Sequence, residues 1–384
     1  MNMTRYSPTN LRATPWRPLL ILTILWCAVS CADPPEIDSQ DRFRVLDYDA
    51  EEERYELMES PISTLEDARS VEGDIVHLRG GGQIIMEHGN PQDETEFEEA
   101  LRIEDSKTPR VSYEIEDGIV TAWDFDSLMM LTLYHHFERA AHYFEDIGVA
   151  HELVGNLPVY YAPRFQILLP FNLLTDNAAY AFTIDAFLMP QQFFLSGLPF
   201  AANRGVIVHE YSHAVFNRIV HDDARAPTYL VEPWPDPAIN RMRALDEGVA
   251  DVFGALATGD PDFISPSIAE EEFAVDRDLS ADREYTNQLH SHVESQDSAI
   301  FNPYQLGSVV ASTIWALRPY IDDITLGQAL VATLEDFAEV EPPYDLSDFF
   351  DPLYDELPQD AQSEACTTFR QRLTAISERL QCEP

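Results

Sequence analysis

The strongest constraint on this chain is a short motif in a helical stretch, His209-Glu210-Tyr211-Ser212-His213. Residues four apart lie on one face of a helix, so His209 and His213 can direct two imidazoles at one metal ion. Apolar residues crowd both sides of the motif, so we expect the helix, 205–220, to be buried. Because polar side chains in a buried helix cost free energy without a partner, the motif predicts a metal site. The alternative is an accidental buried trio.

A catalytic zinc ion usually has three protein ligands and one open position for water. A second apolar helix, expected at 245–258, carries Glu247 and Asp251 at helical spacing. One of these carboxylates can bind the metal while the other accepts the spare N–H of a ligand histidine. Glu247 is the preferred ligand, and Asp246 competes with it. The alternative is a helix with three acids on a solvated face. Glu210 lies beside the ligand face, within reach of a metal-bound water.

These segments resemble the gluzincin zinc metallopeptidases, most of all the fungalysin and thermolysin families. The similarity rests on the motif at 209–213, on Asn217-Arg218, and on Glu-Gly-Val-Ala-Asp at 247–251. The resemblance implies a site with zinc as cofactor, in which the ligands are His209, His213 and Glu247, the general base is Glu210, and the partner of His209 is Asp251. Outside roughly residues 120–320 the similarity is weak.

The resemblance also implies an α+β fold with two lobes. An N-terminal mixed β-sheet lobe is expected at 71–204 and a mainly helical C-terminal lobe at 205–384, with the zinc helix between them. The Asn-Ala-containing stretch 177–180 resembles the edge strand that pairs with the substrate backbone in thermolysin-like enzymes. A simple core strand preceded by a turn is the equal alternative.

The implied activity is peptide hydrolysis, and we predict an endopeptidase that acts on peptide or protein substrates. In the related families a histidine three residues before a glycine stabilises the oxyanion. The counterpart here is Tyr304 before Gly307. A phenol can also donate a hydrogen bond, and His290 or His292 could fill the role instead.

Two other functions compete with the endopeptidase. The substitution at Tyr304 favours a lipid-anchored binding or scaffold protein on an impaired peptidase fold, whereas the intact metal motifs oppose it. An aminopeptidase of the same clan is the weaker rival, because the Gly-x-Met-Glu-Asn segment typical of that group is absent.

The N-terminus has the pattern of an export signal. Residues 1–30 combine three arginines and no acid with an apolar run, which predicts a signal peptide. The sequence before Cys31 resembles a bacterial lipobox, so a lipid on Cys31 would anchor the protein to the cell envelope, with the outer membrane or cell surface favoured. The alternatives are an ordinary cleaved signal and an uncleaved anchor.

Residues 31–70 read as an acidic tether with a helical stretch at 49–58. Cys366 and Cys382 remain as a pair and predict a disulfide.

The net charge of −44 excludes nucleic acid as a partner, because such a chain repels phosphate backbones. Calcium could bind at the acidic stretch 93–99, but no pattern there indicates it. The sequence leaves the oligomeric state open.

Periodicity predicts the remaining elements. Short alternating runs at 74–79, 83–87, 110–115 and 118–122 read as hairpins. A strong helix is expected at 127–147, where we predict surface or packing roles, rather than a metal site, for His135, His136 and His142. Strands follow at 157–169 and 179–189, and helices at 304–317, 326–337, 346–357 and 364–380.

Overall fold

The computed structural model describes residues 37, 40–49, 52, 54–86, 101–166, 177–190, 197–221, 237–268, 277–295, 302–341 and 343–383. All of them belong to one compact unit. The predicted signal peptide, Cys31 and the acidic stretch 93–99 lie outside the described residues. So does most of the proline-rich stretch between the two metal-motif helices. No described helix is both long and apolar enough to cross a membrane.

The strands form three sheets. A four-stranded sheet has the order β2-β1-β9-β8, a six-stranded sheet β12-β13-β10-β5-β4-β3, and a three-stranded sheet β11-β6-β7. Parallel pairs (β1 with β9, β10 with β5 and with β13, β11 with β6) stand beside antiparallel pairs, so the sheets are mixed. The strands are β1 Arg42–Asp49, β2 Arg54–Ser60, β3 Leu65–Asp67, β4 Glu72–Gly73, β5 Val76–Gly80, β6 Gln83–Met86, β7 Leu101–Glu104, β8 Tyr113–Glu116, β9 Ile119–Ala122, β10 Leu157–Tyr161, β11 Arg164–Gln166, β12 Ala179–Ala181 and β13 Ala186–Met189.

The helices dominate the second half of the chain. They are α3 Phe125–Asp146, α4 His151–Val154, η1 Phe200–Ala202, α5 Arg204–Phe216, η2 Asn217–His221, α7 Pro237–Thr258, η3 Ser265–Ser267, α8 Asn287–Val293, α9 Pro303–Trp315, α10 Asp323–Phe337, α11 Ser347–Glu356 and α12 Gln359–Arg372. The helices expected from periodicity at 127–147, 205–220, 245–258, 304–317, 326–337 and 346–357 are confirmed, whereas the helix expected at 364–380 is α12, which ends at Arg372.

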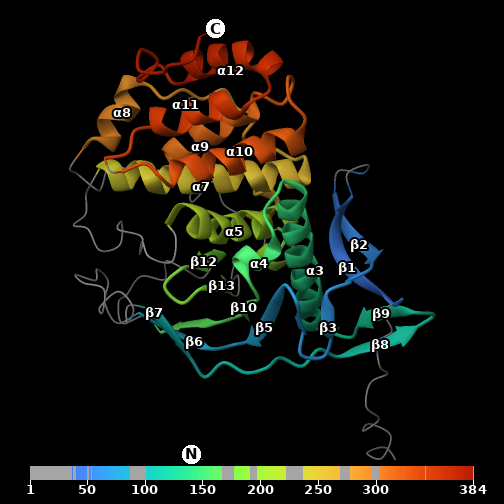
Figure 1. The fold of residues 1–384 in the computed structure, drawn as a ribbon. Helices are drawn as coiled ribbons and strands as arrows, with labels where there is room; N and C mark the ends of the chain where they lie inside the picture. Colours follow the sequence, from blue (N-terminus) through green and yellow to red (C-terminus); the bar gives the residue numbers. More distant parts are fainter. Residues whose placement is uncertain are drawn as a thin grey trace, which may run out of the picture. The chain divides into compact units, whose positions relative to one another are not determined.

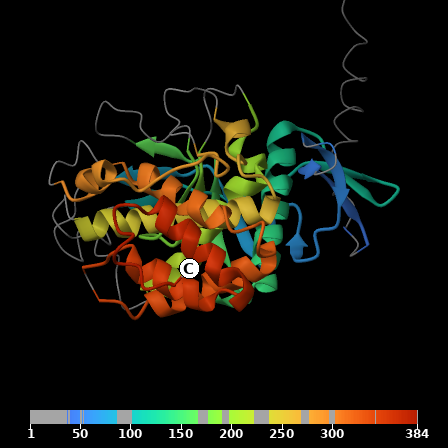
Figure 2. The same ribbon diagram turned by 90° about the horizontal axis from the view of Figure 1, so that it is seen from above.

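The helix α5 lies between the sheets and the C-terminal helices (Figure 1). It packs against α3 and β12 on the strand side and against α7 on the other side, and α7 in turn packs against α9. Figure 2 shows α3 between the β1–β2 pair and the helices α5 and α7. The predicted α+β fold, with a mixed-sheet N-terminal region, a helical C-terminal region and the motif helix between them, is therefore confirmed.

The predictions of a tether at 31–70 and a helix at 49–58 are wrong for the residues that the structure describes. Residues 42–49 and 54–60 form the antiparallel pair β1–β2, and Phe43 and Val45 of β1 are buried in the core. Glutamate-rich sequence favours helix locally, but pairing with β1 outweighs that preference.

The hairpin predictions are half right. β8 and β9 form an antiparallel hairpin whose turn, Asp117-Gly118, has positive φ at both residues. β5 and β6 do not pair, because Gly81 and Gly82 pass the chain from the six-stranded sheet into the three-stranded one. The disulfide Cys366–Cys382 is confirmed and connects α12 to the C-terminal residues.

Candidate metal centre

The helix α5 begins at a well-formed cap. The Asn203 side chain accepts hydrogen bonds from the backbone N–H groups of Gly205 and Val206 at 3.0 and 3.3 Å. Gly205 permits close packing, since a Cβ at this position would lie 2.4 Å from the Phe263 ring. The cap and the glycine fix where the helix starts, and therefore how its histidines are turned.

The helix α7 brings the third candidate ligand to the same place. It crosses α9 at two glycines: a Cβ on Gly248 would lie 2.7 Å from the carbonyl oxygen of Gly307. This close approach sets Glu247, the neighbour of Gly248, and Tyr304, one turn before Gly307, on facing helices.

Three side-chain atoms from α5 and α7 converge on one point. The Nε2 atoms of His209 and His213 are 3.1 Å apart, and Glu247 Oε2 lies 3.5 Å from the first and 3.8 Å from the second. A tetrahedral ion with ligands at about 2.0–2.2 Å holds them ~3.3–3.5 Å apart. The three distances lie close to that range, and the structure groups these three residues as able to hold a metal ion.

Carboxylates fix the tautomer of both histidines. His209 Nδ1 lies 3.1 Å from Asp251 Oδ1, and His213 Nδ1 lies 2.7 Å from Asp246 Oδ1. Each Nδ1–H donates to its carboxylate, which leaves each Nε2 directed at the shared point as the atom that a metal ion would bind. Asp251 therefore lies where it was predicted. Asp246, considered as a competing ligand, instead partners His213.

The electrostatics of this cluster favour a cation. Four carboxylates, those of Glu210, Asp246, Glu247 and Asp251, face two imidazoles and one guanidinium, that of Arg277. Burial would lower the pKa of His213, but Asp246 and Glu247 raise that pKa to about 10. The surroundings thus strongly stabilise positive charge next to this imidazole.

The lowered pKa of Glu247 also indicates a site for a cation. Burial would raise its pKa, but His209, His213 and Arg277 hold the pKa of Glu247 to about 2, so the carboxylate is ionised. Its Oε2 atom is buried and accepts no hydrogen bond from the described residues. Such an atom is costly unless a cation contacts it. The donor set of two imidazoles and one carboxylate suits zinc.

Glu210 lies next to these ligands on α5 and is buried. Its Oε2 accepts a 2.7 Å hydrogen bond from the backbone N–H of Tyr180 in β12. Burial raises the pKa of Glu210, and the nearby histidines only partly offset this effect. A carboxylate with a raised pKa is a better proton acceptor near neutral pH.

Arg277 is a site residue that the sequence analysis missed. Its guanidinium donates to both oxygens of Asp251, and its Nη2 lies 3.8 Å from Glu247 Oε2. The same group stacks 4.8 Å from the centre of the Tyr304 ring. An arginine in an acidic segment has no motif of its own, so only the fold reveals this contact.

The structure brings Tyr304 to the site. Glu247 and burial raise the pKa of its phenol, and Glu210 and Asp251 add to the effect. The group therefore stays protonated and can donate a hydrogen bond. His292 is half-buried on α8, and within the described part of the chain it makes no hydrogen bond or ion pair with the other site residues. His290 bonds to the hydroxyl of Tyr285 at 2.8 Å.

Asn217 and Arg218 attach β12 to the end of α5. Arg218 pairs with Asp185 in the β12–β13 turn, and Asp185 accepts a 2.7 Å hydrogen bond from the hydroxyl of Tyr180. The amide of Asn217 donates to the same hydroxyl at 3.3 Å. Tyr180 thus contacts the motif helix through both its backbone and its side chain. Among the described strands, β12 stands at an edge of its sheet, which favours the edge strand over the core strand as the interpretation of 177–180.

Comparison with known proteins leaves the chain without a close relative. No family model and no curated protein matches it. Among solved structures, the chain is similar to the precursor of protealysin, a metalloproteinase from Serratia proteamaculans, with a TM-score of 0.46 and 10% sequence identity. The match covers 79% of this chain and 88% of that chain. A similarity this low does not establish a shared activity.

Proposed function

We propose that this protein is a zinc-dependent peptidase, and specifically an endopeptidase. The observation that carries the proposal is the convergence of the Nε2 atoms of His209 and His213 and a Glu247 oxygen that accepts no hydrogen bond from the described residues, beside the buried Glu210 carboxylate. His209, His213 and Glu247 would hold the zinc. When bound, the zinc would lower the pKa of a water towards ~7 and polarise the scissile carbonyl.

Glu210 acts as the general base in this proposal. The N–H of Tyr180 holds one of its oxygens, which leaves the other to accept the proton of the attacking water. The protonated carboxyl then delivers that proton to the leaving amine. Its raised pKa suits both transfers, because a carboxylate of higher pKa is a stronger base and its protonated form can still act as an acid.

Tyr304 supplies a hydrogen-bond donor to the site, and Arg277 supplies a positive charge. The protonated phenol of Tyr304 donates to the oxyanion that forms on the substrate carbonyl. Arg277 fixes Asp251, which orients His209, and its stacking against Tyr304 fixes the ring plane. His292 remains a predicted alternative donor without a supporting contact.

An extended peptide would bind along β12. Among the described strands this one pairs only with β13, so its other edge can add a peptide strand through backbone hydrogen bonds. The hydrogen bond from Tyr180 to Glu210 places that edge next to the base. The preference for an endopeptidase comes from this open edge, which can accept residues on both sides of the scissile bond.

We also propose that the protein is exported and that a lipid on Cys31 is its only membrane attachment. The support is the pattern of residues 1–30 and the sequence before Cys31. The disulfide Cys366–Cys382 agrees with an oxidising compartment.

The test compares the wild type with Glu210→Gln on a mixed peptide library and on casein. We expect wild-type cleavage between internal residues, a loss of at least about 10²-fold in the variant, and unchanged zinc content. His142→Gln, on the exposed side of α3, is the control and should behave as the wild type. Bound zinc with no Glu210-dependent cleavage would favour the binding or scaffold protein instead.

A further inference from the structure

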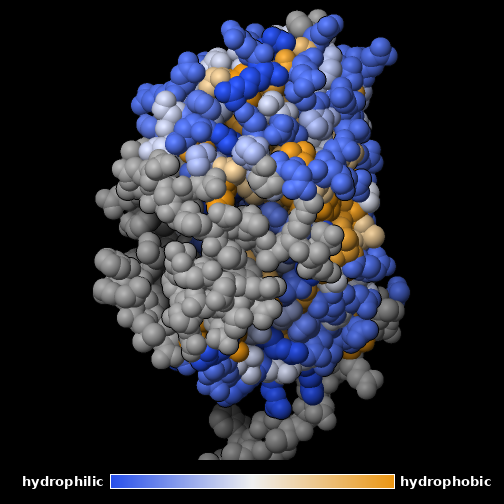
Figure 3. Space-filling view, turned by 60° about the vertical axis from the view of Figure 1, so that its left-hand side comes forward, coloured by the Kyte–Doolittle hydropathy of each residue, from blue (hydrophilic) through white to orange (hydrophobic). Residues whose placement is uncertain are grey.

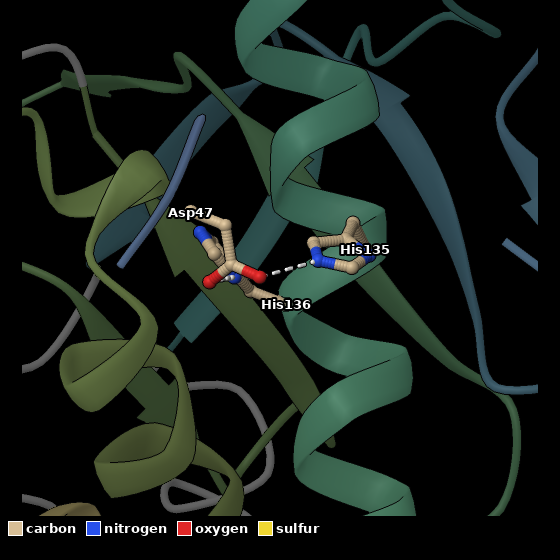
Figure 4. A group of neighbouring side chains, drawn as sticks. All are labelled: Asp47, His135 and His136. Atoms are coloured by element: carbon tan, nitrogen blue, oxygen red, sulfur yellow. Dashed lines mark hydrogen bonds and ion pairs between the residues drawn. The ribbon is translucent and has the colours of Figure 1, made fainter. Parts of the chain in front are cut away.

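A second group of potential ligands lies at the start of the motif helix. Asp47 of β1 and the adjacent His135 and His136 of α3 are all buried, with exposures of 6%, 1% and 0%. Figure 4 shows the Asp47 carboxylate next to both histidine rings. The proposed peptidase mechanism uses none of the three.

The tautomer of His136 follows from its hydrogen bond. Its Nε2 lies 3.1 Å from the carbonyl oxygen of Ala202, which can only accept, so Nε2 carries the proton. Nδ1 then holds a lone pair. This atom is buried, has no hydrogen-bond partner among the described residues, and lies 4.0 Å from Asp47 Oδ1. Two acceptors therefore face each other in the interior.

The Asp47 carboxylate can accept more hydrogen bonds, or a metal ion, beyond its present contacts. Its Oδ1 takes a 2.8 Å hydrogen bond from the N–H of Tyr48, and its Oδ2 lies 3.0 Å from His135 Nε2. Each carboxylate oxygen offers two lone pairs, so one on each oxygen is not accounted for by these contacts. His135 Nδ1 is also buried without a partner. His135 meets Asp47 through Nε2, so His136 Nδ1 is the nitrogen that both faces the carboxylate and lacks a partner among the described residues.

We propose that Asp47, His135 and His136 form a second binding site for a divalent transition-metal ion such as zinc. The ligand atoms are a carboxylate oxygen of Asp47, Nε2 of His135 and Nδ1 of His136, which lie within 4.8 Å of one another. His135 Nε2 lies 3.0 Å from Asp47 Oδ2 and His136 Nδ1 lies 4.0 Å from Asp47 Oδ1, on either side of the ~3.3–3.4 Å between two ligands of a tetrahedral ion. Small rotations of the side chains would bring all three into contact with the ion.

The position of the cluster suggests a structural role. Asp47 lies on β1, the histidines lie on α3, and Ala202 lies one residue before the cap of α5. An ion here would join the β1–β2 pair, α3 and the start of the motif helix. Because such an ion binds the folded chain only, its binding free energy would stabilise the fold.

Arg204 is the other charge that acts on Asp47. Its Nη2 is engaged with the carbonyl oxygen of Ala257 at 2.6 Å, so the guanidinium is held by a different partner. A metal ion must compete with this electrostatic attraction for the carboxylate. We therefore expect the second site to bind zinc less tightly than the first site does.

The test measures metal stoichiometry in protein that lacks the first site. His213→Gln removes a ligand there and leaves the second cluster intact. We expect about two equivalents of zinc in the wild type, about one in His213→Gln, and none in the double variant His213→Gln, Asp47→Asn. Titration of His213→Gln with Co²⁺ should give the visible absorption of a tetrahedral complex. His142→Gln, on the same helix as the cluster histidines, is the matched control and should leave the stoichiometry unchanged.

A water molecule between Asp47 and His136 is the competing explanation for the unpartnered atoms. In that case His213→Gln would contain no zinc and would give no cobalt spectrum, which would overturn the proposal. This result needs no variant of the buried cluster, so a folding defect in Asp47→Asn cannot obscure it. The proposal does not depend on the peptidase assignment, because the readouts are metal content and absorption.

Discussion

Each of the two ligand histidines has its own carboxylate, and the two carboxylates come from the same helix. Asp246 contacts His213 and Asp251 contacts His209, while Glu247 between them turns to the shared point. The sequence motif identified Asp251 because it is four residues after Glu247. It favoured Glu247 over Asp246 as the ligand but gave Asp246 no partner, since adjacent helical residues differ by about 100° in direction and the facing helix decides which one reaches the histidines.

Tyr304→Phe is the residue-scale test of the oxyanion donor. Removing one such donor typically costs about 10²–10³-fold in kcat, and binding of the ground state should change little. We therefore expect a large fall in kcat with nearly constant KM in steady-state kinetics on a fluorogenic peptide. Tyr320→Phe, which alters a half-exposed tyrosine on the surface, is the control. An unchanged kcat would assign the oxyanion to another group, with Arg277 as the first candidate.

Glu210 should reduce the stability of the metal-free protein. Its pKa in the folded state is raised above the ordinary value of 4.5, chiefly by burial, so the ionised form is less favourable in the fold than in the unfolded chain. The cost is absent below pH 4.5, grows as pH rises from 4.5 to the folded-state pKa, and is constant above it. In the presence of a chelator, Glu210→Gln should thus melt at a higher temperature than the wild type at pH 8.

The same comparison at a pH below 4.5 provides the internal control. There both side chains are neutral, so the difference in melting temperature should disappear. A variant that melts lower than the wild type at pH 8 would contradict the assignment of a raised pKa to Glu210.

At the scale of elements, the contact between α7 and α9 decides where the ligand and the oxyanion donor meet. A methyl group on Gly248 would meet the carbonyl oxygen of Gly307 at 2.7 Å and Val310 at 3.0 Å. Gly248→Ala should therefore push the helices apart. We expect a loss of about 1–3 kcal/mol in the free energy of unfolding by urea denaturation, together with a lower kcat. Full stability and activity would show that the helices can shift at no cost.

Periodicity predicted the helices well and the strands less well. The helices at the site are long and apolar on a helical repeat, so local sequence is sufficient for them. β1 has alternating Phe43 and Val45, a signal for a half-buried strand, but the surrounding acids suggested a tether. The pairing of β6 with β7 and β11 could not be predicted, because strand order depends on contacts between distant segments.

At the scale of the whole molecule, the high negative charge is carried by a folded protein. On the face drawn in Figure 3, hydrophilic residues cover most of the described surface. A net charge of −44 produces self-repulsion that opposes the compact state. Within this excess, the candidate metal centre brings four of the carboxylates together, where His209, His213, Arg277 and a bound cation would balance them.

Salt should therefore stabilise the protein. Between about 10 mM and about 1 M NaCl the Debye length falls from about 30 Å to about 3 Å, which screens the repulsion between surface carboxylates. We expect the melting temperature of the zinc-loaded protein to rise over this range in differential scanning calorimetry. A melting temperature that falls with salt would show that surface ion pairs outweigh the repulsion.

The fold class could be predicted from the whole sequence, whereas the N-terminal boundary of the folded unit could not. The two metal motifs identified the central helices, and the resemblance to gluzincin metallopeptidases predicted the arrangement of strands and helices around them. The predicted tether failed because composition alone does not distinguish an acidic linker from an acidic strand pair such as β1–β2, whose buried face is narrow.

The most direct test is anomalous diffraction at the zinc absorption edge from crystals of the purified protein. We predict a peak about 2.0–2.2 Å from the Nε2 atoms of His209 and His213 and from an oxygen of Glu247, with Glu210 beside it. A crystal grown with zinc that lacks a peak at this point, or in which the Glu247 side chain faces elsewhere, would contradict the account.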